Sequence, residues 1–238
     1  MNGLYTAASA LDSFRVRQEA IAHNLANTQT VGFKRVSVRT QSFAQTLDGA
    51  MSGQVEAKAE VDFTQGDLVH TGEPLDLGLD GEGFFAVDTP NGVRYTRAGA
   101  LRRDPQGRLV TASGEPLQSA GGGPLKLGDA PLSEIKVLAD GRVLTPGGAE
   151  GESPRLKVVL LEGPGALQPD GASLYKAGPE QIEVASEALV QQGYRERSNA
   201  EPVQELLSMI EVHRMFESAT QSIQAATRAL ERTSSEVL

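Results

Sequence analysis

One long helical pattern near the end of the chain decides the fold: PVQELLSMIEVHRMFESATQSIQAATRALER, residues 202–232. No Gly or Pro follows Pro202 in this run, so we expect roughly 30 helical residues and a helix about 45 Å long. Apolar residues recur at alternating three- and four-residue steps, which is the a/d heptad pattern of a helix seam. The seam consists of Met209, Val212, Phe216, Ala219, Ile223, Ala226 and Leu230.

The start of the chain carries a second helix pattern, from about Gly3 to Ala26, with the same rhythm. Its seam consists of Leu4, Ala7, Leu11, Phe14, Gln18, Ile21 and Leu25. A helix with one apolar stripe needs a partner to cover it, so we expect the two ends to pack together or against copies in an assembly. The alternative is an ordinary monomer, because any amphipathic helix of a monomer also shows periodic apolar residues. Two long seams that contain small residues favour the assembly, and a building block rather than an enzyme.

Short signals mark the ends of these two helices. Asn27 and Gly32 both tolerate positive φ, so both can turn the chain after the first helix. Ser198 and Asn199 are N-cap candidates for the second helix, and Pro202 lies near its first position.

Strand and turn signals dominate the middle of the chain. The Asn91-Gly92 pair joins two β-rich runs and predicts a hairpin with a type I′ turn, and Asp140-Gly141 predicts another hairpin. Residues 156–161 are nearly all apolar and predict a buried strand. Such repeated short strands are typical of an antiparallel sandwich or barrel-like domain.

The predicted fold class is therefore α+β, with the N- and C-terminal helices paired as a coiled coil and a central antiparallel β-rich domain. We expect residues 1–33 and 198–238 to form the helical coiled-coil core domain. Residues 34–62 read as a linker or extended region, and residues 63–197 as a β-rich outer domain.

Composition limits the function. The chain has 238 residues and a formal net charge of -9, which disfavours nucleic acids and anionic membranes as partners. It contains no Cys, so a disulfide framework, a thiolate nucleophile and a Cys-ligated zinc site are excluded. Charged residues interrupt the first 26 positions, and no run approaches the roughly 20 apolar residues of a membrane span. We therefore expect a protein that stays in the cytoplasm unless a signal-independent route exports it.

The candidate catalytic and metal-binding residues do not converge. The three histidines, His23, His70 and His213, fall on different predicted elements, so a shared metal site would need long-range convergence. A second candidate is an acidic group whose spacing matches no calcium loop. This group consists of His70, Glu73, Asp76 and Asp80. We predict no catalytic residue, no metal site and no cofactor.

Several short motifs, in this order along the chain, resemble those of bacterial flagellar rod and hook proteins: LYTAAS at 4–9, NLAN at 24–27, TVGFK at 30–34, TQGDL at 64–68, GEGFF at 81–85, QGY at 192–194 and SN at 198–199. The residues that carry the resemblance are Asn24, Leu25, Ala26, Asn27, Gly32, Phe33, Gly66, Gly83, Phe84, Phe85, Ser198, Asn199 and Pro202. The chain departs from the family at His23, where Asn is usual, and at Ala200-Glu201, where Val-Asn is common. The short stretch between Lys34 and Thr64 resembles proximal rod subunits more than distal rod or hook subunits.

The resemblance implies a structural subunit of the basal-body rod, which transmits torque and encloses the export channel. It also implies export through the flagellar type III apparatus without a cleaved signal, terminal helices that line the channel, and a strand domain that faces outward. The implied partners are copies of the chain and other rod and hook subunits, without nucleic acid, inserted membrane segment or cofactor. Three alternatives stay open: a secreted wall-binding β-domain on a helical stalk, a hydrolase without a recognisable motif, and a distal rod or hook subunit.

Overall fold

A computed structural model describes the backbone of residues 2–47, 50–146, 153–163 and 167–235, and side chains over 9–40, 57–146, 153–163 and 167–228. The chain forms two compact units. The helical unit comprises Met1–Asn27, Val36–Asp62 and Ala200–Leu238, and the β-rich unit comprises Thr28–Arg35 and Phe63–Asn199. The class is α+β, with two terminal helices and a central antiparallel β-rich region, as predicted.

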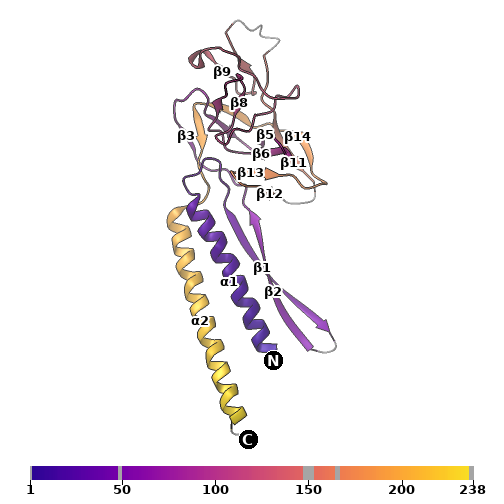
Figure 1. Ribbon diagram of the computed structural model, residues 1–238, viewed down its shortest axis with the longest axis vertical. Coiled ribbons are helices and arrows are strands. Elements are labelled where there is room, and N and C mark those ends of the chain that lie inside the picture. The colour runs from indigo at the N-terminus through magenta and orange to yellow at the C-terminus, as the bar shows by residue number, and fades with distance from the viewer. Residues whose placement is uncertain (1, 48–49, 147–152, 164–166, 236–238) are drawn as a thin grey trace. The chain divides into compact units, whose positions relative to one another are not determined.

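In the helical unit, α1 (Asn2–Ala26) and α2 (Pro202–Ser235) lie side by side and run antiparallel (Figure 1). Their bounds are close to those that the periodicity predicted. The 34 residues of α2 span about 50 Å, and its C-terminal turns continue past the start of α1 (Figure 1). No helix within the described part of the chain is long and apolar enough to cross a membrane.

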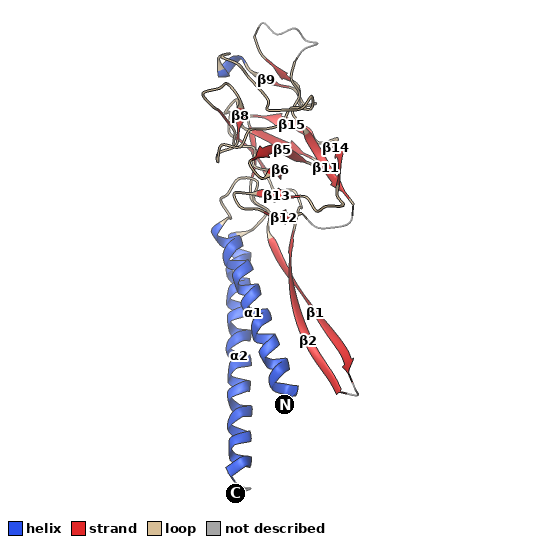
Figure 2. Ribbon diagram, turned by 45° about the vertical axis from the view of Figure 1, so that its right-hand side comes forward, coloured by secondary structure: helices blue, strands red, loops and turns tan. Residues whose placement is uncertain are grey.

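The same unit contains a long β-hairpin. Strands β1 (Val36–Leu47) and β2 (Ala50–Val61) pair antiparallel from Val36↔Val61 to Leu47↔Ala50. Both strands contact α1 (Figure 2). The hairpin occupies most of residues 34–62, which the sequence pattern predicted as a linker or extended region. A two-stranded hairpin is at best marginally stable alone in water, so packing on α1 supports it.

The β-rich unit is built on a six-stranded antiparallel sheet with the order β12-β13-β6-β5-β11-β14. The bounds of its strands are β5 Phe84–Thr89, β6 Gly92–Thr96, β11 Val158–Glu162, β12 Gln168–Pro169, β13 Leu174–Lys176 and β14 Ile182–Ala185. Four short antiparallel pairs surround it, β3–β16, β4–β15, β7–β8 and β9–β10. Their bounds, with the 3-10 helix η1, are β3 Leu68–His70, β4 Leu77–Asp80, β7 Arg102–Arg103, β8 Leu109–Val110, η1 Leu132–Glu134, β9 Lys136–Val137, β10 Val143–Leu144, β15 Leu189–Gln192 and β16 Tyr194–Glu196.

One apolar core fills this unit. It joins side chains from β4, β5, β8, β10, β13 and β15 with residues of the connecting loops, so strands far apart in sequence share a single interior. Its members are Leu75, Leu77, Leu79, Phe85, Val87, Leu101, Leu109, Leu117, Leu125, Leu127, Ile135, Val143, Leu156, Leu174 and Val190.

Both predicted hairpins form, but neither has a type I′ turn; at the second, Gly141 has a positive φ and Asp140 does not. Thr89 pairs with Gly92, so the central residues of the first turn are Pro90 and Asn91. Neither has a positive φ, as a type I′ turn would require. The residue with a positive φ is instead Gly92, which directly follows the turn and has φ +98°. The Asp140-Gly141 hairpin joins β9 to β10 as predicted.

The apolar run at 156–161 is only partly buried. Leu156 and Val159 are buried, whereas Leu160 and Leu161 are half-buried. Residues 158–161 of the run lie in β11, so the strand was predicted correctly, but the predicted burial holds for only part of the run.

Candidate functional site

The inward side of α2 uses several positions of the predicted seam. Val212 is buried and Met209, Ala219 and Ile223 are half-buried. Phe216 and Ala226 are exposed although they share the heptad pattern. Part of the seam on α2 is therefore already covered within the subunit.

On α1, Ile21 is buried, and Leu11, Phe14 and Leu25 are half-buried, whereas Gln18 is exposed. Leu4, Ala7 and Leu230 belong to the two helices, but their side chains lie outside the described residues. The role of the seam in an assembly stays a prediction.

A polar network fixes the two helices and the hairpin to one another. The fully buried Asn24 of α1 donates from Nδ2 to the Val36 carbonyl at 2.9 Å and to Glu205 Oε2 of α2 at 3.3 Å. Its Oδ1 accepts the Val36 N–H at 2.8 Å. A buried amide on one element that bonds groups on two others sets the mutual register of all three. This motif residue therefore positions α1, α2 and β1.

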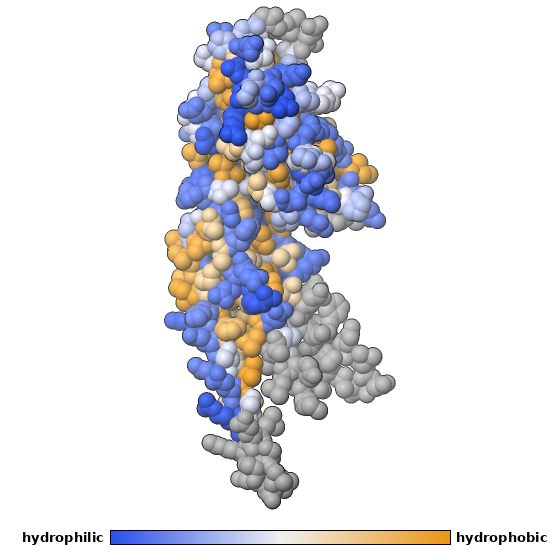
Figure 3. Space-filling view, in the orientation of Figure 1, coloured by the Kyte–Doolittle hydropathy of each residue, from blue (hydrophilic) through white to orange (hydrophobic). Residues whose placement is uncertain are grey.

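The outward side of α2 carries an apolar patch that the heptad pattern did not include. Its members lie on one helix face at the first turns, roughly 160° from Val212. They are Val203, Leu206, Leu207 and Ile210, which are 66%, 49%, 58% and 52% exposed. Figure 3 shows apolar side chains gathered over this part of α2, on the side away from α1. We call these four residues the α2 outer patch.

The patch is a contiguous surface rather than scattered exposure, because its residues are neighbours on one helix face. The same face becomes polar further along, at Arg214, Gln221 and Arg228. The first turns of α2 are therefore apolar on two opposite sides, which is typical of a helix that is buried from both sides. The sequence contains both the predicted seam and the outer patch, and their apolar residues alternate along the first turns of α2. A search for one a/d heptad pattern finds only the seam.

The β-rich unit contains a buried charged cluster. Lys34 and Glu196 are both fully buried, and Lys34 Nζ lies 2.5 Å from Glu196 Oε1. The same Nζ donates to the Thr64 carbonyl at 2.6 Å, and the Gly66 N–H donates to Glu196 Oε1 at 2.9 Å. Arg97 Nη1 donates to Glu196 Oε2 at 3.2 Å. One carboxylate thus joins segments around residues 34, 66 and 97.

Arg97 gives this cluster an excess of positive charge. Its Nη2 donates to the Gly81 carbonyl at 2.7 Å, and its guanidinium lies 5.4 Å from the centre of the Phe84 ring. Burial lowers the pKa of Arg97, and the charge of Glu196 opposes that effect. Two cations share one carboxylate, so Glu196 is the residue whose loss costs most.

Two motif glycines lie where backbones approach closely. Gly32 has φ +66°, and a Cβ added there would lie 2.3 Å from the Ala98 nitrogen. A Cβ at Gly66 would lie 2.2 Å from the Arg197 carbonyl oxygen. Gly32 thus adopts the predicted positive φ, whereas Asn27 does not. Asn27 instead donates from Nδ2 to the His23 carbonyl at 2.8 Å.

Gly32→Ala is expected to lower the free energy of unfolding by about 3 kcal/mol, because it adds a backbone clash to the left-handed strain. Gly171→Ala is the matched control, since Gly171 has φ +78° but its added Cβ meets nothing within 4 Å. It should cost only about 1 kcal/mol. Urea unfolding followed by circular dichroism measures both, and equal losses would contradict the close approach at Gly32.

The remaining motif residues differ in how deeply they are buried. Phe33, Gly83, Phe84 and Phe85 are buried, and Phe63 packs edge-on against Phe84 with ring centres 5.3 Å apart. Ala26 and Pro202 are exposed, and Ser198 is half-buried.

The predicted N-caps were wrong, because α2 begins at Pro202, beyond both Ser198 and Asn199. Asn199 instead accepts the Arg35 N–H at 2.7 Å and donates to the Thr64 carbonyl at 3.0 Å.

Two of the histidines and Asp76 of the acidic group contact neighbouring side chains. Asp76 accepts from Thr71 Oγ1 at 2.6 Å and from Arg195 Nε at 2.5 Å. The His70 ring packs against Tyr194, and His213 pairs with Glu217 on α2. Among the residues that the structure describes, no group of three His, Asp or Glu could hold a metal ion.

Three segments of the chain match models of known protein families. Residues 4–34 match the family model described as "Flagella basal body rod protein". Residues 78–145 match "Flagellar hook protein FlgE/F/G D1 domain", and residues 191–236 match "Flagellar basal body rod FlgEFG protein C-terminal". The three matches cover α1, much of the β-rich unit and α2.

Full-length relatives are similar along nearly the whole chain. The flagellar basal-body rod protein FlgF of Caulobacter vibrioides is 35% identical, with 91% of this chain and 90% of the relative covered. The FlgF of Rhizobium meliloti is 31% identical, with 97% and 95% covered. The rod protein FlgG of Bacillus subtilis is 26% identical, with 97% of each chain covered.

Proposed function

Because the chain belongs to the flagellar basal-body rod protein family, whose members are structural proteins and not enzymes, we propose that it polymerises through its terminal helices into the rod. In this proposal α1 and α2 pair as a coiled coil, transmit torque, and enclose the export channel. The subunit reaches the basal body through the flagellar type III apparatus without a cleaved signal. It needs no cofactor, nucleic acid or inserted membrane segment. The higher identity to the FlgF relatives supports a proximal rather than a distal position in the rod.

The α2 outer patch is the observation that carries this proposal. An exposed apolar patch on a polar, acidic protein costs free energy in water, and burial regains about 25 cal/mol for each Å². The inward side of α2 already packs against α1, so a helix that approaches the outer patch must come from another subunit. Contacts of this kind, repeated along an axis, build a helical assembly rather than a closed ring.

The fixed register within the helical unit supports the same role. A drive-shaft must transmit torque without a change in the position of its helices. The buried Asn24 network resists sliding of α1 against α2, since a one-turn shift would leave Glu205 and the Val36 backbone without Asn24.

Purified basal bodies test the proposal. The chain, expressed with a small tag in a strain that lacks its own gene, should restore swimming. It should also co-purify with the rod after detergent and salt washes that remove peripheral proteins. A tagged chain that restores swimming yet is absent from the washed basal bodies would refute a structural place in the rod.

A further inference from the structure

The two edges of the six-stranded sheet differ in how well they are protected. Strand β12 has two residues and contains Pro169, which has no N–H to donate. Short edge strands and prolines are common means by which sheets avoid pairing with other chains. Strand β14, at the opposite edge, has four residues, Ile182–Ala185, with neither Pro nor Lys among them. This edge is therefore the longer and the less protected of the two.

The hydrogen-bond pattern shows which groups point away from the sheet. The Ser186 N–H donates to the Val158 carbonyl at 3.3 Å, and Leu160 stands opposite Val184. In an antiparallel ladder, hydrogen-bonded pairs alternate with non-hydrogen-bonded pairs. The backbone of Val184 thus faces β11, while the N–H and C=O groups of Glu183 and Ala185 face outward. These outward groups match those that an added strand requires.

The apolar face of the sheet continues to this edge. Val158 stands opposite the core residue Phe85 and packs partly against the core, and Leu160 is half-buried beside it. Val184 is 39% exposed and Ile182 is 68% exposed on the same face. An apolar row thus leads from the core to the edge, where its outermost residues, Val184 and Ile182, are exposed.

Two hollows border the strand. The larger, of about 440 Å³, is lined by Leu160 and Val184 together with Glu82, Glu162 and Glu187. These three glutamates are exposed, and the described residues that line this hollow include neither Lys nor Arg. A positively charged partner therefore complements its rim.

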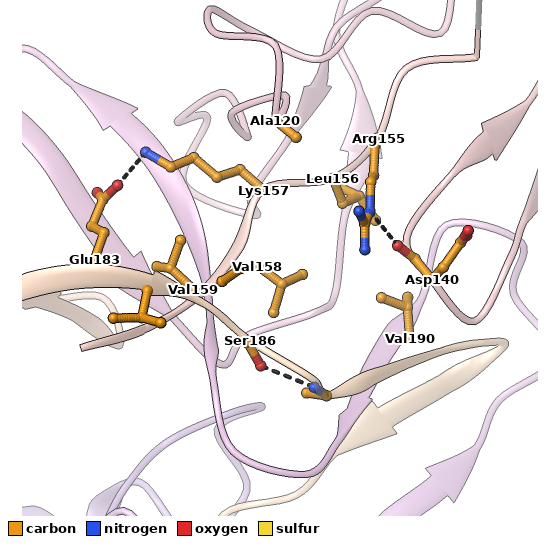
Figure 4. A pocket seen from close by; sticks show the side chains of 13 residues that line it. Ala120, Asp140, Arg155, Leu156, Lys157, Val158, Val159, Glu183, Ser186 and Val190 are labelled. Atoms are coloured by element: carbon orange, nitrogen blue, oxygen red, sulfur yellow. Dashed lines mark hydrogen bonds and ion pairs between the residues drawn. The ribbon is translucent and has the colours of Figure 1, made fainter. Parts of the chain in front are cut away.

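The smaller hollow, of about 270 Å³, appears in Figure 4. There, Lys157 Nζ lies 2.6 Å from a carboxylate oxygen of Glu183 (Figure 4). The Tyr95 hydroxyl donates to the same carboxylate at 2.6 Å. Burial alone would raise the pKa of Glu183, but these hydrogen bonds outweigh it and lower the pKa. The charge of Glu183 is already compensated within the chain, so this residue is not expected to bind a partner. The negative charge that would attract a basic partner comes from Glu82, Glu162 and Glu187.

We propose that β14 accepts an extended segment of another protein as an added strand, with apolar residues on one face and basic residues at its ends. The apolar residues lie against Val184 and Leu160, and the basic ends pair with the rim glutamates. Main-chain hydrogen bonds to Glu183 and Ala185 hold the segment, in the manner of strand addition. A second copy of this chain fits less well, because it also carries a net charge of -9.

A synthetic peptide tests this proposal on the full-length chain. The probe is a fluorescent, acetylated peptide of alternating threonine and valine with lysines at both ends, and its binding is measured by anisotropy. Ala185→Pro removes the outward N–H and should weaken binding on the order of tenfold. Ala185→Ser keeps that N–H and should bind like the parent. Glu187→Lys should weaken the lysine peptide and strengthen a version with glutamates at its ends.

A second arm leaves the protein unchanged. The same peptide with N-methyl groups on alternate amides cannot complete the ladder and should lose most of its binding. Equal binding by the methylated peptide, equal binding by Ala185→Pro, or no saturable binding to the parent chain would each overturn strand addition. If Ala185→Pro instead reduces self-association in sedimentation, the occupant is a second copy and the basic partner is wrong. None of these arms involves α2, so a failure here leaves the rod proposal standing.

Discussion

Glu196→Gln is expected to lower the free energy of unfolding of the β-rich unit by about 4 kcal/mol, because it removes the carboxylate that both buried cations contact directly. The amide can offer an oxygen to Lys34 and Gly66, but its NH₂ group then faces Arg97. Lys34→Met should lower the free energy of unfolding less, by about 2 kcal/mol, because Arg97 and Glu196 remain as an ion pair with no net charge. Urea unfolding followed by circular dichroism measures both losses.

The main test of this prediction is which of the two variants loses more free energy of unfolding. Both residues have fully buried side chains, so burial alone would make their replacements similarly costly. Glu73→Gln provides the control for loss of a carboxylate, because Glu73 is exposed, and it should unfold like the parent. A larger loss for Lys34→Met than for Glu196→Gln would contradict the assignment of Glu196 as the shared counter-ion.

Ile210→Asp is expected to abolish swimming while the isolated subunit keeps its fold. Ile210 is half exposed on the α2 outer patch, so a carboxylate there remains hydrated in the free chain. In the proposed rod the same position is buried against a neighbouring subunit. An unpaired charge there costs several kcal/mol in each subunit. Swimming in soft agar measures the effect on assembly, and circular dichroism of the purified chain measures the fold.

Two further substitutions separate assembly from folding. Val212→Asp places the charge on the buried side of α2, so it should reduce the helicity of the subunit itself. Gln221→Asp lies on the outward face beyond the patch and is already exposed, so it should swim normally. Normal swimming by Ile210→Asp would show that the outer patch is not buried in the rod.

The strongest sequence predictions were those that depend on local periodicity or local backbone geometry. The bounds of α1 and α2 followed from apolar spacing and the absence of Gly and Pro, because helix formation is governed by neighbours three and four residues apart. The positive φ of Gly32 and the Asp140-Gly141 hairpin were predicted for a similar reason. Local patterns failed where a side chain bonds a residue far away in the sequence. Asn199 forms hydrogen bonds with the backbone of Arg35 and Thr64 and does not cap α2.

The sequence by itself therefore determined the two helices, the β-rich middle and, through its motifs, the family. Only the tertiary structure decided which apolar faces are covered, because burial depends on partners that are far apart along the chain. Val212 and Ile210 are two residues apart on one helix, yet one is buried and the other exposed. Lys34 and Glu196 are separated by 162 positions and neither signals the other in the sequence. The exposed edge at β14 is likewise visible only once the order of the strands is known, since no local pattern shows which strand lacks a neighbour.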